Sequence, residues 1–138
     1  MDNAWQLAQG VLNSQPFTKH MGATLDVVEI GYIELSLQLT KEHCQHHGFV
    51  HGGVLSFMAD TSLTFAGGST LGNVVTSEYK INYLKPAIGQ KLVAKATAVS
   101  TGRTQAVCEC KIYCENDGKE KLVCLAQGTI VKVQAKPF

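Results

Sequence analysis

Asp60 is the charged residue whose surroundings point most directly to chemistry. It is the only Asp, Glu, Lys or Arg between Glu42 and Glu78, and it lies in an apolar run, residues 54–66, that has the composition of a buried helix. An ionised carboxylate is costly to bury unless hydrogen bonds or an opposite charge compensate it, and this run supplies no cation. Such carboxylates are concentrated at functional sites. Asp60 is therefore a candidate to attack a substrate or to activate water.

The start of the same run is the second feature that could take part in a reaction. The helix opens with His51-Gly52-Gly53, and Asp60 follows the histidine by nine positions. Backbone N–H groups at a helix N-terminus stabilise negative charge, such as the charge that develops on a carbonyl oxygen under attack. A helix N-terminus that can hold an oxyanion, followed by an isolated carboxylate, indicates acyl-group chemistry.

Structural explanations compete with each of these interpretations. Asp60 could be a buried carboxylate held by neighbouring hydroxyls, with Thr61, Ser62 and Thr64 as the candidate donors. His51 could cap the helix or orient the preceding loop rather than transfer a proton. The two glycines that follow it could simply permit close packing at the start of the helix.

Length and composition exclude several classes of function. The 138 residues suit a single domain, residues 1–138, that can bury one core without disulfides or metals. The net charge of +1 comes from scattered lysines and arginines, without the basic block that nucleic-acid binding needs. No apolar run has the length of a membrane span, and the first residues lack the pattern of a signal peptide. We expect a cytoplasmic protein with no nucleic-acid or membrane partner.

The five cysteines are an odd number, which argues against a disulfide framework. Cys108, Cys110 and Cys114 share one apolar face of an expected strand. Neighbours on such a face are about 6.6–7 Å apart, too far for two thiolates to share a zinc ion. We therefore expect these three cysteines to be small residues of the core. The histidines within residues 43–51 have no spacing that requires them to converge, so no metal site is expected.

Apolar periodicity predicts the elements of the first half of the chain. The apolar residues within residues 4–14 fall on one face of a short amphipathic helix. Asp2 can cap the start of this helix, and Gln15-Pro16 should end it. Residues 24–39 alternate with a period of two, and Gly31 divides them into a hairpin. The long apolar helix starts at Gly53 and is expected to end near residue 66, at Gly67-Gly68.

The second half of the chain reads as four strands, at about residues 74–84, 91–100, 104–115 and 121–133. A helix that is apolar nearly all round must be enclosed, and an antiparallel sheet of about six strands is available to enclose it. The sequence predicts an α+β fold in which a curved sheet wraps around a long central helix. The last strand is apolar on both faces, which indicates packing on the helix and on a second subunit.

This order of elements, with His51-Gly52-Gly53-Val54 opening the long helix and Asp60 inside it, resembles the hotdog fold. More narrowly, the chain is similar to the acyl-CoA thioesterases related to the phenylacetate-pathway thioesterase. The resemblance extends over almost the whole chain and includes the motifs Pro16-Phe17, Asn82-Tyr83-Leu84-Lys85-Pro86, Gly102-Arg103 and Gly128-Thr129.

The resemblance implies roles in catalysis. The thioester carbonyl would point at the helix N-terminus, where the N–H of Gly53 or Gly52 donates a hydrogen bond. Gln45, six positions before the histidine, would help to polarise that carbonyl. Asp60, contributed across a dimer interface, would act as nucleophile or as general base for water. Thr76, on the strand after the helix, would position the water or the carboxylate.

The resemblance also implies how substrate and subunits are arranged. His51 would orient the loop beside the carbonyl or transfer a proton. Phe57 is a candidate to line the acyl pocket, and core packing explains this residue equally well. The nucleotide of the acyl-CoA would lie near Lys85 and Gly102-Arg103, where a cation can meet phosphate. Taken alone, each of the two cations could equally be an ordinary solvated charge. Asp60 lies more than two helical turns beyond the helix start, at about 1.5 Å per residue. A second subunit could close that gap, so we expect a homo-oligomer with sites shared within a dimer. The resemblance further implies a tetramer made of two dimers.

Three functions compete on this pattern. The leading one is hydrolysis of an acyl-CoA thioester to free acid and CoA, without a metal or organic cofactor. The second is a non-catalytic acyl-CoA binding module, which would need no carboxylate, so Asp60 and Gln45 favour the enzyme. The third is an acyl-thioester hydratase or dehydratase, which needs an acid and a base at the acyl α and β carbons. The His51-Gly52-Gly53 arrangement fits carbonyl polarisation better than this third chemistry.

Overall fold

The computed structural model describes residues 3–134, and the structural statements below concern that part of the chain. Asp2, the expected cap of the first helix, lies outside it. Three helices longer than one turn and six strands follow one another, in the order α1 (Asn3–Asn13), α2 (Pro16–Met21), β1 (Thr24–Glu29), β2 (Tyr32–Gln38), α3 (Gly52–Leu71), β3 (Val74–Tyr83), β4 (Lys91–Thr101), β5 (Gln105–Asn116) and β6 (Lys119–Lys132). A short 3₁₀ turn, Lys41–His43, lies in the loop before α3.

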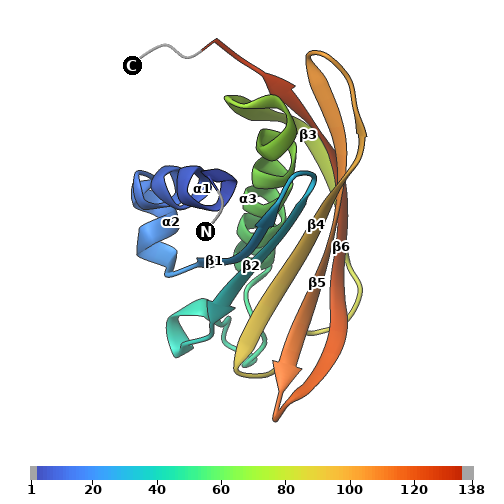
Figure 1. The fold of residues 1–138 in the computed structure, drawn as a ribbon. Helices are drawn as coiled ribbons and strands as arrows, with labels where there is room; N and C mark the ends of the chain where they lie inside the picture. Colours follow the sequence, from blue (N-terminus) through green and yellow to red (C-terminus); the bar gives the residue numbers. More distant parts are fainter. Residues whose placement is uncertain (1–2, 135–138) are drawn as a thin grey trace.

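The six strands form one antiparallel sheet with the order β1-β2-β4-β5-β6-β3. The sheet curves around α3, which runs along its concave face, and α1 and α2 lie on the other side of that helix (Figure 1). β3 is joined to the sheet only through β6, so it forms one edge. The predicted α+β fold with a curved sheet around a long helix is confirmed.

Burial explains why α3 sits inside the sheet. Met58, Ala59, Leu63 and Ala66 are fully buried, and the helix packs against β3, β4, β5 and β6. Each fully buried Leu or Met side chain contributes roughly 1.5–3 kcal/mol relative to exposure. On the protein surface, a helix with this sequence would expose apolar side chains to water. Enclosure by the sheet is therefore the favourable arrangement.

The expected end of the long helix at Gly67-Gly68 is wrong, because α3 continues to Leu71. Gly67 is needed for packing rather than for termination, since a Cβ atom at this position would lie 2.6 Å from Cγ2 of Ile130 on β6. The chain turns instead at Gly72, whose φ of +93° suits a residue without a side chain.

Pro16 also has a different effect from the one expected. It follows the end of α1, as predicted, but it then occupies the first turn of a second helix, α2. Proline suits that position because its missing N–H would have no partner there and its fixed φ is already helical. The hairpin divided by Gly31 and the four later strands match the prediction within a few residues.

The cysteine prediction is confirmed for the strand residues. Cys108, Cys110 and Cys114 are at most 2% exposed, and all five cysteines are free thiols. Burial raises the pKa of Cys108 to about 11 and that of Cys110 to about 12. These thiols therefore stay protonated at neutral pH and behave as small core residues.

Candidate active site

Asp60 is half-buried on α3, and its carboxylate is held from the neighbouring strand. The hydroxyl of Thr76 on β3 donates to Asp60 Oδ1 over 2.7 Å. A hydrogen bond to a charged group is worth about 1.5–3 kcal/mol, which offsets part of the cost of burying the carboxylate. The structure thus places Thr76 next to the carboxylate, as the resemblance implied.

The nearby helix hydroxyls do not bond to the carboxylate. Thr64 donates to the backbone carbonyl of Asp60 over 2.7 Å and lies 2.8 Å from the hydroxyl of Thr76. Ser62 donates to the carbonyl of Ala59 and contacts a core thiol. Within residues 3–134, Asp60 Oδ2 has no hydrogen-bond partner, so one carboxylate oxygen is fixed and the other is available to a water molecule or a substrate.

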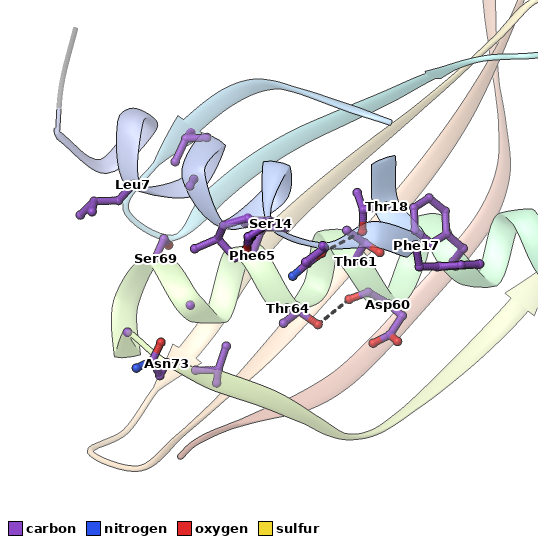
Figure 2. A pocket seen from close by; sticks show the side chains of 18 of the residues that line it. Leu7, Ser14, Phe17, Thr18, Asp60, Thr61, Thr64, Phe65, Ser69 and Asn73 are labelled. Atoms are coloured by element: carbon purple, nitrogen blue, oxygen red, sulfur yellow. Dashed lines mark hydrogen bonds between the residues drawn. The ribbon is translucent and has the colours of Figure 1, made fainter. Parts of the chain in front are cut away.

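Asp60 lines a groove of about 1110 Å³ that runs between α3 on one side and α1 and α2 on the other. Figure 2 shows Thr61 and Phe65 on the α1 side of α3, with Asp60 and Thr64 on the side that faces β3. Leu7 of α1, 66% exposed, contributes apolar surface to this groove. The free carboxylate oxygen is thus next to a space large enough for an acyl group.

Phe57 also lines the groove. Its ring meets the ring of Phe17 edge-on, with the centroids 5.3 Å apart. Phe57 is 9% exposed whereas Phe17 is 61% exposed. Phe57 therefore combines core packing with a place in the groove wall, and Phe17 forms the outer part of the same wall.

The N-terminus of α3 differs from the expectation in one respect. His51 is the N-cap residue, and the N–H of Gly53 donates to His51 Nδ1 over 2.8 Å. Nδ1 accepts this bond, so in the neutral ring the proton resides on Nε2. In this structure the Gly53 N–H is therefore occupied by the capping histidine. No residue in the described range accepts from the N–H of Gly52, which packs beside the Tyr83 ring.

Gln45 lies in the loop before α3 and is not part of the groove wall. Its Oε1 accepts from the backbone N–H of His47 over 2.5 Å, and the backbone N–H of Gln45 donates to the carbonyl of Phe49. These bonds fix the side-chain oxygen inside the loop. The side-chain amide nitrogen, Nε2, has no partner within the described part of the chain. It is therefore the Gln45 atom that can donate to a ligand.

Lys85 and Gly102-Arg103 are exposed and lie at opposite ends of the sheet. Lys85 follows the end of β3, whereas Thr104, next to Arg103, accepts from the N–H of Lys132 beside the start of β3. β3 is about 30 Å long at 3.3 Å per residue, so within one chain these two cations cannot contact the same phosphate group.

A hydroxyl pair in the groove wall was not predicted from the sequence. Ser56 on α3 and Tyr79 on β3 are hydrogen-bonded to each other, and both line the groove with Asp60. The helical spacing of Ser56, Asp60 and Thr64 places them on one face, which the sequence could have indicated. The alignment of β3 beneath that face could not be read from the sequence.

A single chain brings the chemical groups close without completing a site. Gly53 and Asp60 line the same groove, but seven residues of helix correspond to about 10 Å. A reacting carbonyl needs its oxyanion donor and its attacking group each within about 3 Å. In residues 3–134 no group of three or more His, Cys, Asp or Glu side chains could hold a metal ion. None of the helices described could cross a membrane.

Comparisons with known proteins concern the family and the fold of the chain. Residues 47–121 match the thioesterase superfamily. A thioesterase family protein from Silicibacter pomeroyi has a similar structure, with a TM-score of 0.90, 30% sequence identity, and coverage of 94% of this chain and 97% of that one. The Escherichia coli PaaI protein of the phenylacetic acid degradation operon gives a TM-score of 0.86 at 26% identity, covering 95% and 94%.

Two enzymes are also similar in sequence. The acyl-coenzyme A thioesterase PaaI of E. coli is 27% identical over 126 residues, which are 91% of this chain and 88% of that enzyme. The 1,4-dihydroxy-2-naphthoyl-CoA hydrolase of Listeria monocytogenes is 28% identical over 113 residues, covering 80% of this chain and 89% of the hydrolase.

Proposed function

We propose that the chain, which belongs to the thioesterase superfamily, hydrolyses acyl-CoA thioesters to a free acid and CoA. The observation that carries the proposal is the Asp60 carboxylate, held by Thr76 through one oxygen and open to the groove through the other. The E. coli and L. monocytogenes relatives act on CoA thioesters, which supports CoA as the carrier here.

Asp60 Oδ2 can act in two ways at the thioester carbon. As a general base it takes a proton from water, whose oxygen adds to the carbonyl; the C–S bond then breaks and the CoA sulfur receives the proton. As a nucleophile it adds to the carbonyl and expels CoA, leaving an acyl-Asp60 anhydride that water hydrolyses. In both routes negative charge passes through the carbonyl oxygen, which hydrogen-bond donors must stabilise.

The site is shared between two copies of the chain in this proposal. The gap of about 10 Å between Gly53 and Asp60 requires that each carbonyl be served by groups from different helices. β3 supplies the contact, because it is an edge strand of ten residues and carries Thr76 next to the groove. Antiparallel pairing of β3 with a second β3 would bring Asp60 of one copy towards the helix N-terminus of the other.

The same pairing would bring Lys85 and Arg103 of different copies together. It would place the start of one β3 beside the end of the other, so that Arg103 of one copy and Lys85 of the second copy approach the same end of the assembly. Together they could meet the phosphates of one CoA. On the outer face of the sheet, half-buried Val107 and Leu125 support assembly of two dimers into a tetramer.

The proposed activity is tested by free-thiol release from acetyl-, hexanoyl-, dodecanoyl-, benzoyl- and phenylacetyl-CoA. Asp60→Asn and Asp60→Ala should abolish release from every CoA ester that the wild type cleaves. Asp26→Asn is the matched control, because it removes the same charge at an exposed position of β1 outside the groove. Thiol release that survives both Asp60 substitutions would refute the role of this carboxylate. Binding without release would instead identify an acyl-CoA binding module.

A further inference from the structure

The hydroxyls of Ser56 and Tyr79 form a pair inside the groove. Ser56 projects from α3 and Tyr79 from the inner face of β3; both are half-buried and hydrogen-bonded to each other. They share the groove wall with Gly53 and Asp60. Neither hydroxyl has a second hydrogen-bond partner within residues 3–134.

The pair has one more donor than its own bond uses. Two hydroxyl groups carry two protons, and a single hydrogen bond between them engages only one. Whichever hydroxyl donates, the other keeps an O–H that no atom of the described chain accepts. By contrast, the Gly53 N–H already donates to His51. The hydroxyl pair thus keeps an unused donor inside the groove, one helical turn beyond Gly53.

The position of the pair fits a reacting carbonyl. Ser56 is three residues beyond Gly53 and four before Asp60 of the same chain, which is about 4.5 Å and about 6 Å along the helix axis. In the proposed function, the carboxylate that acts at this helix start is Asp60 of the second copy. The three residues lie on one face of α3, as their spacing requires and as their shared groove shows. A substrate held at the helix start would therefore have its carbonyl within reach of the pair.

We propose that the Ser56–Tyr79 pair donates a hydrogen bond to the thioester carbonyl oxygen of the substrate. This inference rests on the proposed thioesterase function. The bond between the two hydroxyls orients the remaining O–H before substrate arrives and makes it a better donor, because hydrogen bonds in a chain polarise one another. A donor fixed in this way stabilises the negative charge that grows on the oxygen as the carbonyl is attacked.

Kinetics of Ser56→Ala, Tyr79→Phe and the double variant test the proposal, with the best CoA ester from the thiol-release series as substrate. Loss of an oxyanion donor lowers kcat by about 100-fold, so we expect that loss in the double variant with KM nearly unchanged. Each single variant keeps one hydroxyl and should lose less. Ser56→Thr keeps the hydroxyl and should retain most of kcat. Tyr32→Phe, which removes a tyrosine hydroxyl bonded to Glu34 outside the groove, is the matched control.

A vibrational measurement separates hydrogen bonding from a structural effect. The same CoA ester, labelled with ¹³C at the carbonyl, is bound to the Asp60→Asn protein and its carbonyl stretch is recorded by infrared difference spectroscopy. The band should lie below that of the free ester and move back up when Ser56→Ala and Tyr79→Phe are added.

Three results overturn the proposal: a double variant with kcat within threefold of wild type, a rise in KM alone, or a carbonyl band that does not move. Failure of the proposed function itself is distinguishable, because then the wild type releases no thiol or Asp60→Asn remains active. Absence of thioester hydrolysis in the wild type removes this proposal as well.

Discussion

Replacing Thr76 by Val removes the hydroxyl that holds the Asp60 carboxylate and keeps nearly the same side-chain volume. The hydroxyl donates to Asp60 Oδ1 over 2.7 Å and lies 2.8 Å from Thr64 Oγ1. A bond to a charged acceptor is worth about 1.5–3 kcal/mol, and both residues are half-buried, so we take the lower half of that range. Thr76→Val should lower the free energy of unfolding by about 2 kcal/mol.

The activity should change with the stability. Without Thr76 the carboxylate can rotate, and a catalytic group that loses its fixed orientation loses rate, here by about tenfold in kcat. Thr76→Ser keeps the hydroxyl and should stay close to wild type in both respects. The assays are urea unfolding followed by fluorescence of the single tryptophan, and steady-state thiol release.

A double-mutant cycle isolates the bond between the two side chains. In an Asp60→Ala background the hydroxyl of Thr76 keeps only its neutral partner, Thr64, and such a bond is worth about 0.5–1.5 kcal/mol. Thr76→Val should therefore cost about 1 kcal/mol less there than in the wild type. An equal cost in both backgrounds would refute the reasoning, because the loss would then come from packing and not from the carboxylate.

Two further predictions concern the core. Gly67→Ala should destabilise the protein by about 1–2 kcal/mol, since its Cβ would overlap Ile130 and overpacking outweighs the gain of up to about 1 kcal/mol in helix propensity. Gly10→Ala, in α1 with nothing within 4 Å of the added Cβ, should stabilise it; a loss at Gly10 or a gain at Gly67 in urea unfolding would contradict this. Burial raises the pKa of Cys108 to about 11 and that of Cys110 to about 12. In the unfolded chain these thiols ionise at a lower pH than in the folded protein. The free energy of unfolding should therefore fall as the pH rises from about 9 towards 11. Cys110→Ala should reduce that slope, and an unchanged slope would show that its thiol does not contribute.

Much of the fold could be predicted from the periodicity of apolar residues, and the candidate site could be located from the isolated charge of Asp60. The long apolar helix could exist only inside a sheet, and the period-two segments supplied the strands for that sheet. Asp60 stood out because no other charge lies near it in the sequence. The error at Gly67 has a general cause, since a glycine pair can end a helix or let it approach a strand, and only the position of Ile130 decides between these outcomes.

The details of the site depended on contacts between distant segments. Thr76 meets Asp60 because a bulge between Thr76 and Glu78 sets which β3 side chains face the helix, and such an irregularity has no signature in the sequence. The bond from the Gly53 N–H to His51 depends on a side-chain rotamer. These two features decide which donors and acceptors remain free, and therefore which chemistry the groove can perform.

The role of the Asp60 carboxylate in thioester hydrolysis is tested most directly by the rate of free-thiol release, measured for the wild-type and the Asp60→Asn protein. Circular dichroism and urea unfolding of the same samples would establish that both are folded. We expect multiple turnovers of at least one CoA ester by the wild type and none by Asp60→Asn. Equal rates in the two proteins would contradict a role of the Asp60 carboxylate in hydrolysis.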